Sequence, residues 1–329
     1  MRPGGSPSHF PLPTAACGRS TLQPLLAYYL HHFSPFIVEF RNGIGLRWYG
    51  LAYVLAFLLG YRLYLWLAQQ RYTDLPPEKV ADFITWAAIF GVMLGGRLGY
   101  ILFYDLQPML ANPWQMLHVW EGGMSSHGGI LGLILFTLYW SRRHRVSWTS
   151  LGDCLVVVAP IGICLVRLAN FINGELYGRI AQVAWAVQFP TELLDRPELA
   201  EAAGAEGYTT AHDLIAQART DPAIAARLRE VLPPRHPSQL YEALLEGVVL
   251  FAALWWLRTR VRAPRGVLTG AFFLLYALLR IAGECFREPD PAWHAGPFSA
   301  GQFLSLFMVL IGAAFLAWGL RTRQYERKS

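Results

Sequence analysis

The chain has 329 residues, of which 54% are hydrophobic and only 15% are charged. Soluble globular proteins carry about a quarter charged residues, so this composition disfavours a soluble enzyme, and it equally disfavours a disordered or collagen-like chain. The net charge of +6 rests almost entirely on arginine, since Lys79 and Lys328 are the only lysines. These values predict an all-α polytopic membrane protein.

Residues 1–33 are rich in Pro, Gly and Ser and are expected to form a disordered or loosely attached extension. Within them, the stretch that ends at Cys17 superficially resembles a lipoprotein cleavage site. It lacks the charged region and the apolar run of a signal peptide. We interpret it as a chance match or as the result of a start codon assigned too early.

Seven apolar segments are long enough, or nearly so, to cross a bilayer. About 20 helical residues span ~30 Å of hydrocarbon, and only helices or closed barrels satisfy their backbone hydrogen bonds in lipid. Long apolar runs favour helices, so we predict seven transmembrane helices, with the third and fifth near the short limit. The segments cover residues 46–66, 84–104, 126–141, 151–169, 241–257, 267–286 and 302–320.

The basic residues predict how these helices are oriented. Lys and Arg are enriched in cytoplasmic loops, and here they gather after the first, third, fifth and seventh segments. The alternate loop 105–125 contains neither Lys nor Arg. The pattern places the N-terminus outside and the C-terminus in the cytoplasm. The basic residues are Arg62, Arg71 and Lys79; Arg142, Arg143 and Arg145; Arg258, Arg260, Arg262 and Arg265; and Arg321, Arg323, Arg327 and Lys328.

This orientation divides the chain into a membrane domain and smaller parts. The domain is expected over residues 34–321, followed by a cytoplasmic tail over 322–329. Residues 170–240 form an external region between the fourth and fifth helices, and the charged, Ala-rich stretch 192–230 predicts short helices outside the bilayer. This region is either a lid or peptide-docking surface, or only a cover for helix ends.

Ionisable residues within membrane segments are costly and usually functional. At 1.5 Å per residue, Arg97, Arg167 and Arg280 lie ~20, ~24 and ~20 Å from the cytoplasmic ends of their segments. Tyr49 and His127 lie near the external ends of two other segments. Five segments therefore place polar groups in the outer half of the bilayer, which predicts one site facing the outer leaflet.

Four polar residues of the sixth segment recur at helical spacing and should form one stripe. Some of these residues also have structural interpretations. Glu284 could simply neutralise Arg280, and Arg287 could form an interfacial ion pair. Arg97 could anchor its helix at lipid headgroups or form a buried structural pair. The stripe consists of Tyr276, Arg280, Glu284 and Arg287.

Arg167 and Arg280 are harder to explain as structural residues. Two buried cations at one depth repel each other unless an anion lies between them, and a phosphate group matches guanidinium donors well. Asn170 shares a helix face with Arg167, and Glu175 follows where the helix should end. His127 is flanked by small residues that would let a ligand approach closely, although a lone histidine is more often structural.

Several chemistries are excluded by missing residues. No lysine lies in a membrane segment, so a retinal Schiff base is excluded, and no H-E-x-x-H, Walker A or paired D-x-x-D motif is present. The four cysteines show no C-x-x-C spacing, so no zinc site or disulfide framework is indicated. A metal-independent transferase or a lipid-handling protein remains. The cysteines are Cys17, Cys154, Cys164 and Cys285.

Six short motifs are spread over the chain. They are RWYGL at 47–51, GGRLGY at 95–100, GGMSSHGG at 122–129, RLANFINGE at 167–175, RHPSQLYE at 235–242 and FREPD at 286–290. In this order they resemble the motifs of bacterial prolipoprotein diacylglyceryl transferases. The resemblance extends over residues 35–320, which is nearly the whole membrane domain.

That family consists of seven-helix enzymes of the bacterial inner membrane. The resemblance implies transfer of the diacylglyceryl group of phosphatidylglycerol to the lipobox cysteine thiol of a preprolipoprotein. This step forms a thioether, releases glycerol phosphate and begins lipoprotein maturation. The implied partners are phosphatidylglycerol, preprolipoprotein signal peptides and the lipid bilayer, with no nucleic acid, cofactor or metal ion.

The resemblance also implies roles for individual residues. Arg167 and Arg280 would hold the lipid phosphate, and His127 is the candidate base for the substrate thiol. The expected catalytic residues are His127, Tyr49 and Tyr276, and the expected substrate-binding residues are Arg97, Arg167, Asn170, Glu175, Arg280, Glu284 and Arg287.

Two other classes of protein share some of these features with an enzyme. A lipid or anion transporter would also place arginine in a bilayer cavity, but it should carry polar groups along a path to both faces. Here the inner halves of the segments are almost purely apolar. A seven-helix receptor would not need several arginines at one depth beside a histidine. Both alternatives are therefore less favoured.

Overall fold

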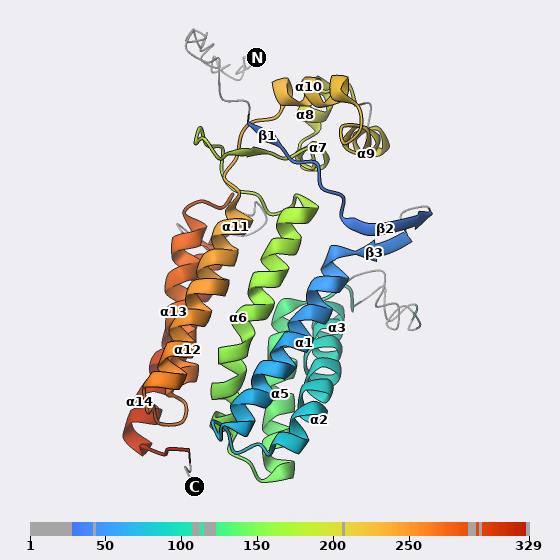
Figure 1. Cartoon of the computed structure of the whole chain (residues 1–329). Helices are drawn as coiled ribbons and strands as arrows, with labels where there is room; N and C mark the ends of the chain where they lie inside the picture. The colour runs from blue at the N-terminus through green and yellow to red at the C-terminus, as the bar shows by residue number, and fades with distance from the viewer. Residues whose placement is uncertain are drawn as a thin grey trace, which may run out of the picture.

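A bundle of long helices carries a smaller region of short helices and strands at one end (Figure 1). We call this smaller region, residues 174–237 together with β1 (Tyr29–Leu30), the cap. The opposite end of the bundle is called the far end. The computed structural model describes residues 28–41, 44–106, 112, 114, 123–205, 208–288, 294–295 and 298–326.

Each of the seven predicted apolar segments is helical over most of its length. The second and fifth segments are composites in which an α-helix passes through a π-helical stretch, η2 or η5. In chain order, the seven segments correspond to α1 (Trp48–Gln69); α2 (Val80–Trp86), η2 (Ala87–Met93) and α3 (Leu94–Tyr104); α5 (Ser126–His144); α6 (Trp148–Asn173); α11 (Ser238–Glu242), η5 (Ala243–Val249) and α12 (Leu250–Arg260); α13 (Val267–Glu284); and α14 (Ala300–Thr322).

Within the described residues, six helices are long and apolar enough to cross a membrane. Helix α5 is not among them, because its first turn contains His127 and its last turn contains Arg142, Arg143 and His144. Polar residues at both ends lower the mean hydropathy of its 19 residues. The six candidate spans are Trp48–Gln69, Pro77–Phe103, Trp148–Asn173, Ser238–Arg260, Val267–Glu284 and Ser305–Thr322.

The main hydrophobic core lies in the half of the bundle next to the far end. There the side chains of Tyr64 on α1, Leu151 on α6 and Leu254 on α12 are fully buried in one cluster. The outer surface of the bundle, in contrast, exposes large apolar side chains such as Leu102 and Leu278. An apolar exterior around an apolar interior is what a lipid-facing bundle requires.

Helices α3 and α5 pack through glycines. A Cβ atom on Gly99 would lie 2.5 Å from the Cα atom of Gly128, and one on Gly95 would lie 2.8 Å from the Cα atom of Gly132. Small residues at every fourth position let two helix backbones approach this closely in a membrane. These glycines are therefore packing residues.

We expect Gly99→Ala to lower the melting temperature of the detergent-solubilised protein by several degrees. The added methyl group has no room against Gly128, and such overpacking costs roughly 1–3 kcal/mol. Gly50→Ala in the first turn of α1 is the matched control, because a Cβ there meets no atom within 4 Å. Equal melting temperatures for the two variants would contradict the packing role of Gly99.

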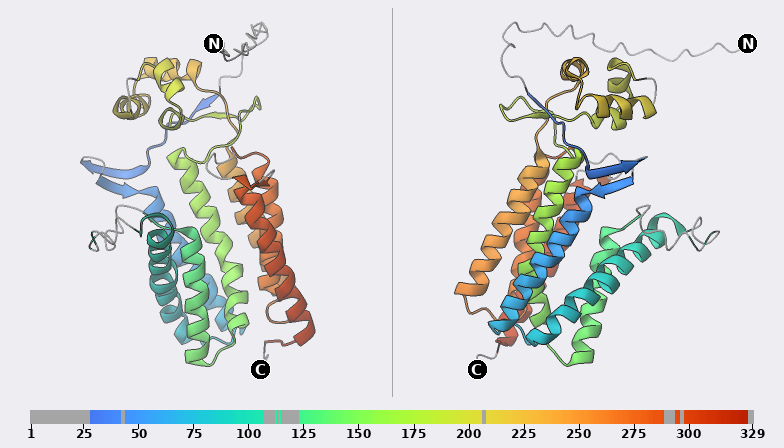
Figure 2. Two further views of the ribbon diagram at one scale, coloured as in Figure 1. Left: turned by 180° about the vertical axis from the view of Figure 1, so that it is seen from behind. Right: turned by 45° about the vertical axis from the view of Figure 1, so that its right-hand side comes forward.

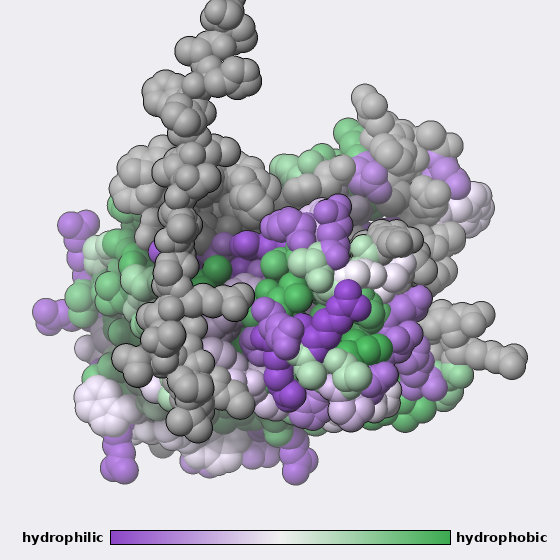
Figure 3. All heavy atoms as spheres, turned by 90° about the horizontal axis from the view of Figure 1, so that it is seen from above, coloured by the Kyte–Doolittle hydropathy of each residue, from purple (hydrophilic) through white to green (hydrophobic). Residues whose placement is uncertain are grey.

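Four short helices build the upper part of the cap, as the composition of residues 192–230 predicted. Seen from above, hydrophilic and hydrophobic residues intersperse over this end of the molecule (Figure 3). A small core that includes Leu193, Ala203 and Leu228 holds the helices together. They are α7 (Glu192–Asp195), α8 (Pro197–Ala202), α9 (Tyr208–Gln217) and α10 (Pro222–Val231).

The last six residues of the expected N-terminal extension are ordered. Strand β1 pairs in parallel with β4 (Val187–Gln188), and His31 is buried against the rings of Phe171 and Phe189. Burial lowers the pKa of His31 to about 4, so the ring is neutral at pH 7. The chain is therefore paired with the cap already at Tyr29, whereas residues 1–27, with Cys17, lie outside the described residues.

Arg235 ties the cap together below these helices. Its fully buried guanidinium group donates from Nε to Glu192 Oε2 at 2.7 Å and from Nη1 to the Gly178 carbonyl oxygen at 3.0 Å. It also pairs with Glu288 Oε2 at 3.2 Å and covers the ring of Tyr177. Burial alone would lower the pKa of Arg235, but Glu192 and Glu288 raise it above its ordinary value.

Polar contacts also fasten the far end. The fully buried carboxylate of Asp153 on α6 accepts hydrogen bonds from the backbone N–H groups of Gly266 and Thr269, at 2.7 and 2.9 Å. It thereby satisfies donors of the first turn of α13 that have no partner within the helix. This contact holds α6 and α13 in register.

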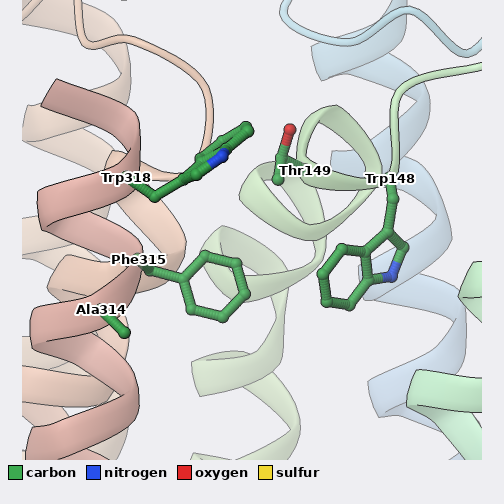
Figure 4. A pocket seen from close by; sticks show the side chains of 5 residues that line it. All are labelled: Trp148, Thr149, Ala314, Phe315 and Trp318. Atoms are coloured by element: carbon green, nitrogen blue, oxygen red, sulfur yellow. The ribbon is translucent and has the colours of Figure 1, made fainter. Parts of the chain in front are cut away.

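An apolar cavity of about 400 Å³ lies nearby, between α6 and α14. Figure 4 shows Phe315 and Trp318 of α14 on the side opposite Trp148 and Thr149 of α6, and Ala314 completes the wall. Trp148 begins α6, so the cavity is about 28 Å along that helix from Arg167 at 1.5 Å per residue. It is therefore remote from the polar residues singled out in the sequence.

Candidate functional site

Helices α6, α11 and α13 meet at the cap end of the bundle (Figure 1). Arginine and glutamate side chains form a network of ion pairs there. Arg167 Nη1 lies 3.1 Å from Glu242 Oε2, and Arg167 Nη2 lies 3.2 Å from Glu246 Oε2. Arg280 Nη1 lies 2.5 Å from Glu242 Oε1 and 3.2 Å from Glu246 Oε1. Each carboxylate therefore bridges both arginines.

Two further residues complete this group, which we call the ion-pair cluster. Glu284 Oε2 lies 3.0 Å from Arg280 Nη2, one helical turn away, and Arg287 Nη1 lies 3.4 Å from Glu242 Oε1. With every member ionised, three cations and three anions balance. The cluster consists of Arg167, Arg280, Arg287, Glu242, Glu246 and Glu284.

A close approach of two helices places the two carboxylates beside Arg167. A Cβ atom on Gly247 would lie 2.5 Å from the Cβ atom of Cys164, so η5 and α6 can touch here only because Gly247 has no side chain. Glu246 precedes Gly247, and Arg167 follows Cys164 by one turn. Interrupting an α-helix with a π-helical stretch such as η5 is frequent at functional sites.

The arginine pair differs from the sequence expectation in its counter-ion. The repulsion argument suggested that a phosphate would lie between Arg167 and Arg280. Here the carboxylates of Glu242 and Glu246 occupy that position. Repulsion between the two arginines is thus relieved within the chain itself, and it no longer argues by itself for a bound phosphate.

Exposure separates the two kinds of charge. The side chains of Glu242 and Glu246 are fully buried, whereas those of Arg167 and Arg280 remain 16% and 14% exposed. The arginines therefore lie between the buried carboxylates and accessible space. An anion approaching from outside would meet guanidinium groups first, which suits them to phosphate binding.

The predicted stripe meets the same two carboxylates, those of Glu242 and Glu246. The Tyr276 hydroxyl donates to Glu246 Oε2 at 3.3 Å, and Arg280 and Arg287 both reach Glu242. Glu284 neutralises Arg280, as its spacing indicated. Three residues of the stripe therefore belong to the ion-pair cluster, and the fourth, Tyr276, is hydrogen-bonded to it.

A second polar group lies one turn further along α6. The Tyr49 hydroxyl donates to Glu175, and the Asn170 amide donates to both, reaching Glu175 Oε1 at 2.7 Å. Gln239 Nε2 donates to the backbone carbonyl oxygen of Glu175 at 2.6 Å. Tyr49 comes from α1, which packs along α6, so residues 126 positions apart meet at the cap end.

Arg97 and His127 belong to a different part of the structure. Arg97 is buried and donates from Nη1 to the Gly123 carbonyl oxygen at 3.1 Å, which holds the segment leading into α5. His127 is exposed in the first turn of α5. None of the described contacts joins His127 to the ion-pair cluster. Figure 2 (right) shows α3 and α5 leaning away from α1 towards the cap end.

Sequence reasoning missed the two residues on which the cluster centres. Glu246 lies inside the fifth apolar segment, where an ionisable residue is costly and usually functional. The sequence therefore contained a signal for Glu246. Glu242 stood out only as the last residue of the RHPSQLYE motif. Within the described residues, no group of three or more His, Cys, Asp or Glu side chains is arranged to hold a metal ion.

Comparisons with known proteins agree on one family. The family model described as prolipoprotein diacylglyceryl transferase matches residues 35–318. A phosphatidylglycerol–prolipoprotein diacylglyceryl transferase of Coxiella burnetii is 38% identical over 300 residues, which cover 90% of this chain and 99% of that protein. Proteins of the same name from Geobacter sulfurreducens and Rhodospirillum centenum are 44% and 43% identical, over 85% and 82% of this chain and 93% and 86% of their own lengths. The chain belongs to the prolipoprotein diacylglyceryl transferase family.

Proposed function

We propose that this chain transfers the diacylglyceryl group of phosphatidylglycerol to the lipobox cysteine thiol of preprolipoproteins. The products are a thioether-linked lipid and glycerol phosphate, and the reaction is the first step of lipoprotein maturation. Family membership supports the reaction. The observation that carries the assignment to a site is the pair Arg167 and Arg280, held side by side at the cap end with part of their surface accessible.

The reaction is a displacement at the glycerol C3 carbon of the lipid. A carbon–sulfur bond forms, the carbon–oxygen bond to phosphate breaks, and the thiol gives up its proton. Arg167 and Arg280 would stabilise the negative charge that develops on the departing phosphate, because donors act strongly in a site of low dielectric constant. Tyr49 and Tyr276 would donate to the same oxygens or relay the proton, while Asn170 and Glu175 shape the site.

A free thiol has a pKa near 8.5, so a base must favour the thiolate, and His127 is our candidate. Because no described contact joins His127 to the ion-pair cluster, the peptide would have to lie between α5 and α6. Helices α3 and α5 lean outward there, which leaves a route for an apolar signal peptide from the side (Figure 2). Arg97 would act by holding the segment that carries His127.

We further propose that α5 is a seventh transmembrane helix. The described chain begins in the cap with β1 and ends beyond α14 at the far end, which requires an odd number of crossings (Figure 1). With α5 added to the six candidate spans, the count is odd. The arginine-rich loops place the far end in the cytoplasm, so the cap and the site face the outer leaflet of the bacterial inner membrane.

The nucleophile belongs to the substrate, so we expect a variant without cysteine to keep a substantial part of the transfer activity. Cys154 is buried, Cys164 is half-buried and Cys285 is exposed, and none contacts the cluster arginines through a described hydrogen bond. All four cysteines, Cys17 included, would be changed to Ser or Ala. Complete loss of transfer in a folded variant would contradict a substrate-borne nucleophile.

The test uses purified protein in detergent, a lipobox peptide, and phosphatidylglycerol labelled in its glycerol headgroup. Released glycerol phosphate and peptide mass are measured together. We expect the peptide to gain one diacylglyceryl mass for each glycerol phosphate released, and Arg167→Ala to lose both signals. Lipid binding without either product, in conditions where a related transferase is active, would contradict the proposal and favour a transporter.

A further inference from the structure

Carboxylates already engage the guanidinium groups to which a lipid phosphate would bind. Both terminal nitrogens of Arg167 pair with carboxylate oxygens of Glu242 and Glu246. Arg280 Nη1 pairs with the same two carboxylates, and its Nη2 pairs with Glu284. The planar guanidinium fork binds a carboxylate and a phosphate through the same nitrogens. The two anions therefore compete for these donors.

The charge balance of the ion-pair cluster also indicates that a phosphate competes with the carboxylates. Its three cations are balanced by three anions, so a phosphodiester entering it adds an uncompensated negative charge. The side chains of Glu242 and Glu246 are fully buried, so solvation by bulk water cannot replace the pairing with an arginine. An arginine that turns towards the phosphate therefore weakens its pairing with a buried carboxylate.

We propose that Glu246 is a positioning residue that acts as an internal counter-anion, which the lipid phosphate must displace from Arg167 and Arg280. Its carboxylate holds the two guanidinium groups and the Tyr276 hydroxyl in place before lipid binds. The carboxylate also weakens binding of the phosphate by competing with it. This inference rests on the proposed function, because it concerns how the same site takes up phosphatidylglycerol.

A substitution of Glu246 tests this competition more cleanly than a substitution of Glu242, because Glu242 also supports other parts of the cluster. Glu242 also pairs with Arg287 and precedes the π-helical stretch, so its loss disturbs more of the cluster. In Glu246→Gln, Glu242 still bridges Arg167 and Arg280. The amide has an oxygen at only one of the two carboxylate positions, so one arginine keeps an acceptor and the other faces the amide nitrogen. One guanidinium donor is thereby released.

The experiment measures binding and turnover in detergent micelles for wild type and Glu246→Gln. We expect the Kd of a short-chain phosphatidylglycerol to fall about tenfold, the change expected for one charge-assisted hydrogen bond gained, with KM falling in parallel and kcat not rising. A short-chain diacylglycerol, which has no phosphate, should bind both proteins equally. Glu78→Gln, an exposed carboxylate near the far end, should behave as wild type.

Unchanged or weaker phosphatidylglycerol binding by Glu246→Gln would overturn the inference, and so would an equal gain for diacylglycerol. If the single variant does not fold, Arg287→Gln is compared with Arg287→Gln/Glu246→Gln, which differ by the same carboxylate. Tighter binding in the double variant supports the inference, and equal or weaker binding overturns it. Wild-type protein that transfers no diacylglyceryl group would instead refute the proposed function.

Discussion

Replacing Arg167 with lysine is expected to lower the rate of diacylglyceryl transfer about 100-fold or more, although the positive charge is kept. Arg167 acts through two nitrogens, with Nη1 3.1 Å from Glu242 and Nη2 3.2 Å from Glu246. An ammonium group is one point on a flexible chain and cannot offer two donors in a fixed plane. Loss of one preorganised donor at a developing charge typically costs about 10²–10³ in kcat.

The assay of released glycerol phosphate measures this loss, and Arg265→Lys is the matched control. Arg265 pairs at the far end with Asp74 at 2.5 Å and with Glu326 at 2.9 Å, in both cases through Nη2. A lysine can replace a contact made through one nitrogen, so this variant should keep most of its activity. Near wild-type activity in Arg167→Lys would show that transfer does not depend on the guanidinium fork.

The sequence predicted the cations of the site better than its anions. Arg280 and Glu284 are four residues apart on one helix, so their pairing follows from helical spacing alone. Glu242 and Glu246 reach Arg167 across 75 and 79 positions, and no local pattern encodes that distance. The argument that an anion must lie between two buried arginines was sound, but it could not identify that anion.

His127 shows a second limit of the same reasoning. Its position in the sequence places it near the level of the arginines, and a common level predicts a common site. Depth along the membrane normal says nothing about lateral separation, and α5 leans away from α6 at this end (Figure 2). The association of His127 with the arginines therefore stays a prediction that requires bound substrate.

The fold was predictable where it depends on periodic apolar runs. All seven segments are helical, because a long run of apolar residues that must satisfy its own backbone in lipid forms a helix. The sequence analysis did not predict the pairing of β1 with Val187 and Gln188, about 158 residues away. This pairing holds the end of the expected extension against the cap. The sequence analysis also did not predict the π-helical stretch η5, which contains the close contact of Gly247 with Cys164.

Substitution of Arg235 by methionine is expected to destabilise the cap by about 3–5 kcal/mol, the usual cost of leaving a buried charge without its partner. Arg235 and Glu192 are both fully buried. Without Arg235, Glu192 retains the pair with Arg196 Nε at 3.3 Å, which is more exposed to solvent. Denaturant unfolding in detergent, together with hydrogen exchange over residues 178–236, would measure the loss.

The double variant Arg235→Met/Glu192→Leu should recover much of this stability, because replacing both members of a buried ion pair with apolar residues is often neutral or favourable. Additive effects of the two single changes would contradict direct coupling between them. Transfer activity should recover less than stability does. Arg235 also holds Glu288, whose neighbour Arg287 pairs with Glu242, so the double variant regains a folded cap but not this link to the ion-pair cluster.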